Sequence, residues 1–186
     1  MPTTEPEETI VSRDVMATEV PYGFRVPLMS GTKVTITQSL GGWFTLMTDD
    51  QTMLQIAGKD ADAIGKDPSV VVDAIPATVK DAEEVKTLVW EQLRTCYDPE
   101  IPVNIADLGL IYRCEVQSAG VETCKVEIDM TLTAPGCGMG EFIAMEVRRK
   151  IRQIPTVGEV TVEMVFDPPW SPEMLPEAAR LELGLL

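Results

Sequence analysis

The sequence has no histidine among its 186 residues, which excludes several classes of site. Without an imidazole, Ser-His and Cys-His catalysis are excluded, and so is a metal site with histidine ligands. The four cysteines lack the close spacing of a zinc ribbon, a Cys-x-x-Cys redox pair or a disulfide framework: Cys96, Cys114, Cys124 and Cys137. We therefore expect free thiols. A bound metal would need thiolates, carboxylates or a second chain.

Long apolar runs are also missing from the sequence. No stretch approaches the roughly 20 apolar residues that cross a bilayer. The segment from Met1 to Ile10 is acidic and lacks the basic start and apolar stretch of a signal peptide. We expect a cytoplasmic protein with no membrane partner.

Basic residues are scarce, since 15 Lys and Arg stand against 30 Asp and Glu and give a formal charge of −15. Such an acidic protein repels phosphate backbones and anionic membranes. Nucleic acid is therefore excluded as an expected partner.

The composition, with 45% hydrophobic and 24% charged residues, is typical of a globular chain. The pattern changes near Pro76, in a stretch rich in turn residues, and this predicts two domains. Residues 1–76 are expected to form a small all-β barrel or sandwich, and residues 77–186 a compact α-β-β-α-β-α domain. The predicted fold class is α+β.

Short alternating segments predict the strands of the first domain, at residues 14–20, 33–38, 43–48 and 52–57, with a possible last strand at Val70–Val72. Gly41-Gly42, Asp49-Asp50 and Gly31-Thr32 supply the turns. Trp43 and Phe44 face opposite sides of a strand, so one belongs in the core. The other either covers a loop or offers a surface contact.

In the second domain apolar residues recur at helical spacing, and residues 81–96 and about 138–153 are predicted as helices. Residues 110–117 and 123–133 predict a hairpin that places Cys114 and Cys124 in the core, and residues 159–166 predict a third strand. A last helix follows Trp170, with Ser171 as its cap and Gly184 at its end. Pro176 is placed where it can split off the first turn.

Three irregular stretches are candidates for function. The first, Asp98 to Tyr112, holds the acids Asp98, Glu100 and Asp107 around two prolines that stiffen the loop. These carboxylates either serve a metal or act as a base, or they form local structure: Asp98 can open a turn, and Asp107 or Asn104 can cap one.

The second stretch, Thr131 to Gly140, places Cys137 between two glycines where a strand stops and a helix begins. Helix-start N–H groups can stabilise a thiolate and lower its pKa. The candidate loop residues are Thr133, Pro135, Gly136, Cys137 and Gly138. The alternative is a plain glycine-rich turn with an inert buried thiol.

The third stretch runs from Asp167 to Pro172, where prolines hold Trp170 in an extended segment. The indole either covers the Cys137 site or meets a partner, or else it packs against the final helix.

Taken together and in this order, Asp98 to Tyr112, Thr131 to Gly140 and Asp167 to Gly184 resemble a known family. It is the domain shared by the SufT and PaaD proteins and the eukaryotic cytosolic iron-sulfur assembly factors, here over about residues 80–186. The first half, with Val20 to Gly23 and Ile36 to Gly42, resembles the extra domain of the SufT type.

The resemblance implies a non-enzymatic factor that delivers iron-sulfur clusters or helps to insert them, with Cys137 as the functional thiol and metal ligand. It implies a transient cluster as cofactor, and a scaffold or carrier and client apoproteins as partners. The family's acids correspond to Asp98, Glu100 and Asp107, and Trp170 is expected to bind a partner.

One thiolate falls short of the about four cysteine ligands that clusters usually take. Either two chains share a cluster, a client or carrier supplies ligands, or the site only positions a partner. A shared cluster predicts a homodimer. The alternative function is a binding-only adaptor in protein maturation with a structural Cys137.

Overall fold

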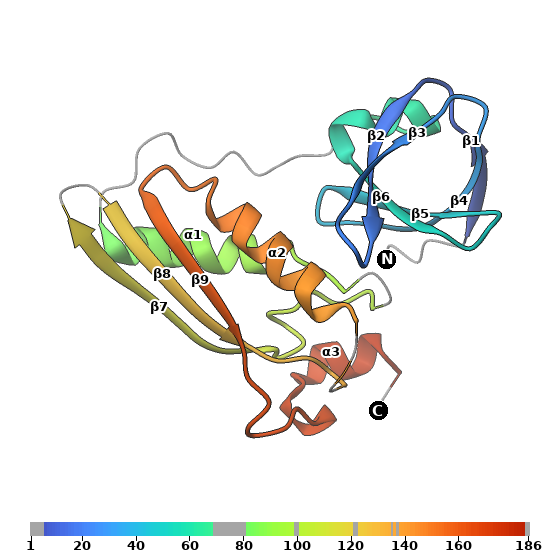
Figure 1. Cartoon of the computed structure of the whole chain (residues 1–186). Helices are drawn as coiled ribbons and strands as arrows, with labels where there is room; N and C mark the ends of the chain where they lie inside the picture. The colour runs from blue at the N-terminus through green and yellow to red at the C-terminus, as the bar shows by residue number, and fades with distance from the viewer. Residues whose placement is uncertain are drawn as a thin grey trace. The chain divides into compact units, whose positions relative to one another are not determined.

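The computed structural model of the chain describes residues 6–68, 81–98, 101–120, 123–134, 136 and 138–184. The chain divides into two compact units, Met1–Ala74 and Ile75–Leu186 (Figure 1). The boundary predicted near Pro76 and the strand expected at Val70–Val72 lie outside the described residues.

The first unit is β-rich, and its strands form one antiparallel sheet in the order β1-β4-β5-β6-β2-β3. The elements are β1 (Glu7–Ile10), β2 (Val15–Val20), β3 (Arg25–Leu28), β4 (Lys33–Leu40), β5 (Trp43–Thr48), β6 (Met53–Ala57) and the 3-10 helix η1 (Gly58–Ile64). The sheet curls around a core that includes Ile36, Leu46 and Ile56, to which η1 adds Ile64 (Figure 1).

Local chemistry explains the turns of this sheet. Gly41 and Gly42 join β4 to β5 with φ values of 61° and 78°, which suits the tight turn of a hairpin. Phe44 is buried in the core and Trp43 is half-buried, so one of the two aromatic residues faces the core as predicted. The prediction missed β1, β3 and η1.

The second unit has the predicted order of elements, α-β-β-α-β-α, and the α+β class is confirmed. Its elements are α1 (Ala82–Leu93), β7 (Ile111–Gly120), β8 (Thr123–Met130), α2 (Gly140–Ile151), β9 (Val157–Met164), the 3-10 helix η2 (Pro172–Met174) and α3 (Glu177–Glu182). Pro176 separates η2 from α3, as its position suggested.

Helix α1 is shorter than the predicted range of residues 81–96. Asp81 caps the helix instead of lying in its first turn, because its carboxylate accepts a hydrogen bond from the Glu84 N–H at 2.9 Å. At the other end the N–H groups of Thr95 and Cys96 bond to the carbonyls of Gln92 and Leu93 in a tight turn. Cys96 therefore lies beyond the helix.

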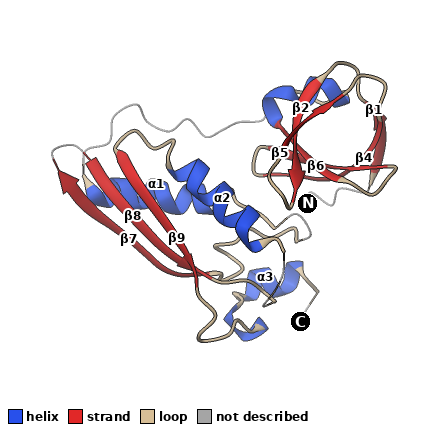
Figure 2. Ribbon diagram, in the orientation of Figure 1, coloured by secondary structure: helices blue, strands red, loops and turns tan. Residues whose placement is uncertain are grey.

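Strand β8 is the centre of a three-stranded sheet, antiparallel to β7 and parallel to β9. Its inward side chains, Val126, Ile128 and Met130, are fully buried, and α1 and α2 pack on the sheet against β7 and β9 (Figure 2). Cys124 is buried as predicted, but the core position predicted for Cys114 is wrong, because this residue is only half-buried on the edge strand β7.

None of the helices in the described part of the chain is long and apolar enough to cross a membrane.

Candidate functional site

The three irregular stretches of the sequence meet at one end of the β7–β8–β9 sheet (Figure 2). The parallel strands β8 and β9 end side by side, with Met130 opposite Met164, and β7 begins at this same end, with Ile111 opposite Met130. The first stretch leads into β7, the second leaves β8 and the third leaves β9. Sheet topology thus brings together segments that are far apart in the sequence.

The first stretch is ordered by local hydrogen bonds around Asn104. Its amide donates to the Asp107 carboxylate at 2.7 Å, and its side-chain oxygen accepts from the Asp107 N–H at 2.9 Å. Asp107 is exposed and lies 4.0 Å from the Arg94 guanidinium. Asn104 therefore caps this turn, which favours local structure over metal binding at Asp107.

Of the other two acids of the first stretch, only Asp98 lies within the described residues. Asp98 is buried, and its carbonyl accepts a hydrogen bond from the Ile101 N–H at 3.0 Å. Glu100 lies outside the described residues.

The cysteine loop, residues 131–140, is held at both of its ends. At its start the Thr131 N–H donates to the carbonyl of Leu110 at 2.8 Å, which joins it to the first stretch. At its end Gly140 begins α2 so close to the strands that an added Cβ would lie 2.8 Å from both Leu132 Cδ1 and Met164 Cε. A larger residue at this position would require the ends of these two flexible side chains to shift.

Inside the loop, Thr133 is half-buried, and Gly136 and Gly138 are exposed. Gly136 has a φ of 83°, a conformation that glycine adopts without steric cost. Pro135 and Cys137 lie outside the described residues. Cys137 precedes Met139, the N-cap residue of α2, by two positions.

The third stretch is fastened to the first by two side-chain hydrogen bonds. The Trp170 indole N–H donates to the carbonyl of Leu108 at 2.8 Å, and the Tyr112 hydroxyl donates to the carbonyl of Pro168 at 2.9 Å. The Met174 carbonyl lies so close to Gly109 that an added Cβ would be 3.1 Å from it. The half-buried Trp170 thus ties two of the motif segments together.

Lys150 of α2 holds the segment after α1 against this helix, and it also forms a buried ion pair within the helix. The Lys150 ammonium lies 3.1 Å from the Glu146 carboxylate, and both side chains are less than one-tenth exposed. Lys150 also donates to the carbonyl and the hydroxyl of Thr95, at 2.5 and 3.0 Å. These bonds satisfy the buried ammonium and fix the chain just before Asp98.

Of the three described cysteines, Cys124 is buried, and Cys96 and Cys114 have raised pKa values that disfavour the thiolate. Burial raises the pKa of Cys96 to about 12, and its Sγ donates to the carbonyl of Gln92 at 3.5 Å. Burial also raises the pKa of Cys114 to about 11, against the opposing field of Lys86. Within the described residues no three histidine, cysteine or acidic side chains cluster as a metal site would require.

Sequence reasoning missed three residues that hold the motif segments, or the chain just before them, in place. Gly140 had a visible signal, because Gly136, Gly138 and Gly140 recur at every second position. Tyr112 lies at an irregularity in the register of β7, and Lys150 lies on the buried face of α2. Neither of these two residues has a local signal of its role.

Comparison with known proteins gives consistent matches. A family model described as "Iron-sulfur cluster assembly protein" matches residues 86–163. The "Fe-S protein maturation auxiliary factor" of Porphyromonas gingivalis is 48% identical over 53% of this chain and 90% of its own length. The "Fe-S protein maturation auxiliary factor SufT" of Staphylococcus aureus is 39% identical over 47% of this chain and 96% of its own length.

Among similar solved structures is a crystal structure from Bacillus anthracis titled as a domain of unknown function, DUF59. It is 32% identical, covers 56% of this chain and 96% of its own chain, and superimposes with a TM-score of 0.48.

Proposed function

The chain belongs to the iron-sulfur cluster assembly protein family, and we propose that it serves this process as a non-enzymatic factor that delivers clusters through Cys137. The observation that carries the proposal is the convergence of the three motif segments on the loop that contains this cysteine. Curated relatives are named auxiliary factors in the maturation of Fe-S proteins, which agrees with a role in assembly.

Cys137 is suited to a thiolate role by its place in the sequence. It lies two residues before the N-cap of α2, where free backbone N–H groups and the helix dipole favour negative charge. Glycines flank it on both sides. Under the proposal Thr133, Pro135, Gly136 and Gly138 shape the loop, and Asp98, Glu100 and Asp107 orient it or hold iron briefly.

The cluster is cargo in this proposal, and Cys137 supplies one of its about four usual ligands. The chain has no histidine, and Cys96 and Cys124 are buried. The remaining ligands come from a second copy, a carrier or the client protein. Light scattering of apo and reconstituted protein tests the second copy, for which a homodimer is the expected state.

Anaerobic reconstitution with iron and sulfide tests the proposal. Wild type and Cys137→Ser are compared by absorption spectra, iron content and activation of a client apoprotein, with Cys114→Ser as the matched control at a half-buried thiol. We expect Cys137→Ser to lose both iron and client activation, and Cys114→Ser to keep them. Retention of both by Cys137→Ser contradicts the proposal.

A binding-only adaptor is the second candidate, because Trp170 and Tyr112 fasten two motif segments together into an ordered surface at this end of the domain. An adaptor would hold no cluster and would still activate the client after Cys137→Ser. The same experiment therefore separates the two functions.

A further inference from the structure

The face of the second-unit sheet that points away from α1 and α2 is open and strongly charged. Lys125, Glu127 and Asp129 of the central strand point to this face and keep 33%, 25% and 21% of their side chains exposed. Their neighbours Val126, Ile128 and Met130 point inward and are fully buried. A central strand with this contrast has one covered face and one free face.

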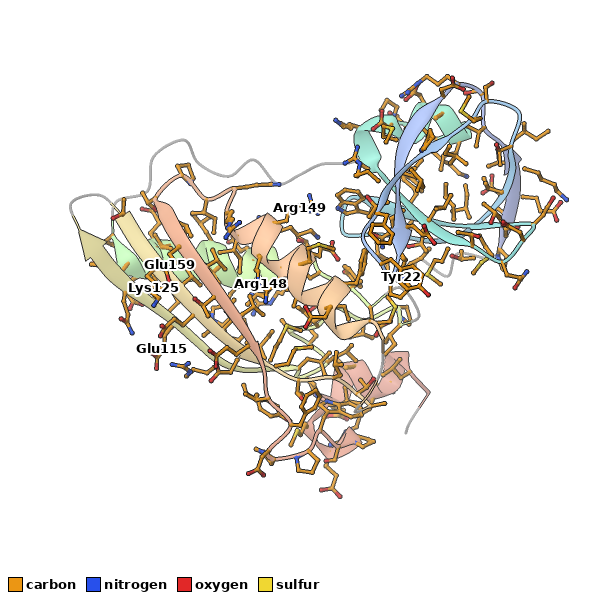
Figure 3. All side chains as sticks on the ribbon, in the orientation of Figure 1. Tyr22, Glu115, Lys125, Arg148, Arg149 and Glu159 are labelled. Carbon is orange, nitrogen blue, oxygen red and sulfur yellow. The ribbon has the colours of Figure 1, made fainter. Side chains whose placement is uncertain are left out.

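Carboxylates outnumber cations on this outer face. Strand register places Arg113 and Glu115 opposite Asp129 and Glu127, and Glu159 and Glu163 opposite Lys125 and Asp129. The cations are therefore Arg113 and Lys125, and the carboxylates are Glu115, Glu127, Asp129, Glu159 and Glu163. Figure 3 labels Glu115, Lys125 and Glu159 on the three neighbouring strands.

Both cations are already engaged by carboxylates of the face. The Arg113 guanidinium donates two hydrogen bonds to the Asp129 carboxylate, from Nε to Oδ2 at 2.7 Å and from Nη2 to Oδ1 at 3.1 Å. Its Nη1 lies 3.2 Å from the Glu115 carboxylate. The Lys125 ammonium lies 3.0 Å from Glu127 and 3.4 Å from Glu159. What the face offers to a partner is therefore surplus negative charge.

A cavity of about 590 Å³ opens at the end of this face. Its apolar lining comes from Ile111, Val165, Pro168 and Met174, and its charged rim from Arg113, Asp129 and Asp167. Met174 is 38% exposed, and Phe166, next to Val165 in the sequence, is 45% exposed. A site of this size takes a few side chains rather than a whole domain.

We propose that this cavity and the acidic sheet face bind a basic, partly apolar peptide segment of the client or scaffold protein. An apolar side chain of the segment enters the cavity, and flanking lysines or arginines lie against Asp167 and the carboxylates of the sheet. This inference rests on the proposed function, since it names the partner chemistry of the same end of the domain. Asp129 on the rim lies two residues before Thr131, where the cysteine loop begins.

Charge selects this occupant over the alternatives. The formal charge of −15 attracts cationic segments and repels anionic ones over long distances. A second copy of the same face would place carboxylates against carboxylates. A basic segment with an apolar anchor satisfies both the surplus charge and the apolar cavity.

Fluorescence anisotropy with short labelled peptides tests the inference on the full chain. The probe is Lys-Leu-Lys-Leu-Lys between Gly-Ser ends, and its controls replace the leucines by serines or the lysines by glutamates. We expect the probe to bind at least about tenfold more tightly than either control, a factor that corresponds to ~1.4 kcal/mol.

Protein variants then locate the binding. Asp167→Lys changes an exposed rim position and Met174→Glu changes the apolar wall, and each is expected to weaken the probe at least about tenfold. Asp49→Lys makes the same charge change at an exposed site of the first unit and is expected to leave binding within about twofold. If circular dichroism shows that Met174→Glu does not fold, the result with Asp167→Lys decides the test.

Three results would overturn the inference: absence of binding, equal binding of the serine peptide, or equal loss with Asp49→Lys. Equal binding of the serine peptide or equal loss with Asp49→Lys would indicate that the acidic protein attracts any polycation without a specific site. Cys137→Ser is expected to bind the probe like wild type. Failure of the proposed function would therefore appear in client activation, and failure of this inference would appear in peptide binding.

Discussion

The indole N–H of Trp170 donates a hydrogen bond of 2.8 Å to the carbonyl of Leu108, 62 residues earlier in the chain. Leu108 is buried, so its carbonyl gains a partner that bulk water supplies poorly there. The bond joins the acidic loop to the segment that leaves β9. Trp170 therefore has a structural role inside the domain, where its indole N–H binds the Leu108 carbonyl.

Replacing Trp170 by phenylalanine removes this donor and keeps an aromatic ring. We expect the free energy of unfolding to fall by about 1–2 kcal/mol, because the carbonyl of Leu108 loses its partner and the smaller ring packs less well. Urea unfolding measures the change. Trp90→Phe is the matched control, since the Trp90 indole N–H has no hydrogen bond to any described residue and its ring faces Arg94. An equal loss in both variants would contradict the role of the hydrogen bond.

Gly109→Ala tests the close approach of the first and third stretches. Gly109 has a φ of 68°, and an added Cβ would lie 3.1 Å from the backbone oxygen of Met174, which cannot rotate away. We expect a loss of about 2 kcal/mol in the free energy of unfolding.

Gly184→Ala is the control for backbone strain alone, because Gly184 has a φ of 69° and nothing within 4 Å of an added Cβ. Its expected cost is about 1 kcal/mol. If the two alanine variants unfold at the same urea concentration, the contact with Met174 contributes nothing.

Thr131→Val removes a buried hydroxyl that has no hydrogen-bond partner among the described residues. Valine has the same shape and avoids the cost of burying an unpaired polar group, so we expect the free energy of unfolding to rise by about 1 kcal/mol. Urea unfolding again provides the measurement.

Thr45→Val is the matched change at a buried threonine whose hydroxyl accepts a bond from the Gln55 amide at 3.4 Å. It is expected to lower stability. If Thr131→Val also lowers stability, the Thr131 hydroxyl has a partner, and the start of the cysteine loop must be reinterpreted.

Sequence patterns predicted the elements that bury a regular face. The spacing of Val85, Leu88 and Val89 specified α1, and strict alternation specified β8. β1 and β3 were missed because they are edge strands formed by pairing with β4 and β2. Glu7–Ile10 is mostly exposed, and β3 contains Pro27, which weakens a strand signal.

The candidate site was predictable in its parts but not in its assembly. Prolines, glycines and a cysteine marked the three stretches in the sequence. Their convergence depends on the parallel pairing of β8 with β9, which no local pattern encodes. The partners of Trp170 and Tyr112 are set by the same long-range topology, so they could not be read from spacing.

The last prediction concerns the reactivity of the thiols and its dependence on pH. At neutral pH Cys137 is expected to be alkylated fastest, because it alone lies in a glycine-flanked turn before a helix. Burial disfavours the thiolate and raises the pKa of Cys114 to about 11 and that of Cys96 to about 12. The labelling rate of Cys114 should therefore rise about tenfold for each pH unit below its pKa and level off above it.

Timed alkylation with iodoacetamide followed by peptide mass spectrometry measures all four rates in one sample. The Cys137→Ser protein is the control, in which Cys114 and Cys96 should keep their wild-type rates if their slow reaction reflects burial rather than competition with Cys137. Faster labelling of Cys96, Cys114 or Cys124 than of Cys137 in the folded protein would contradict the assignment of the functional thiol.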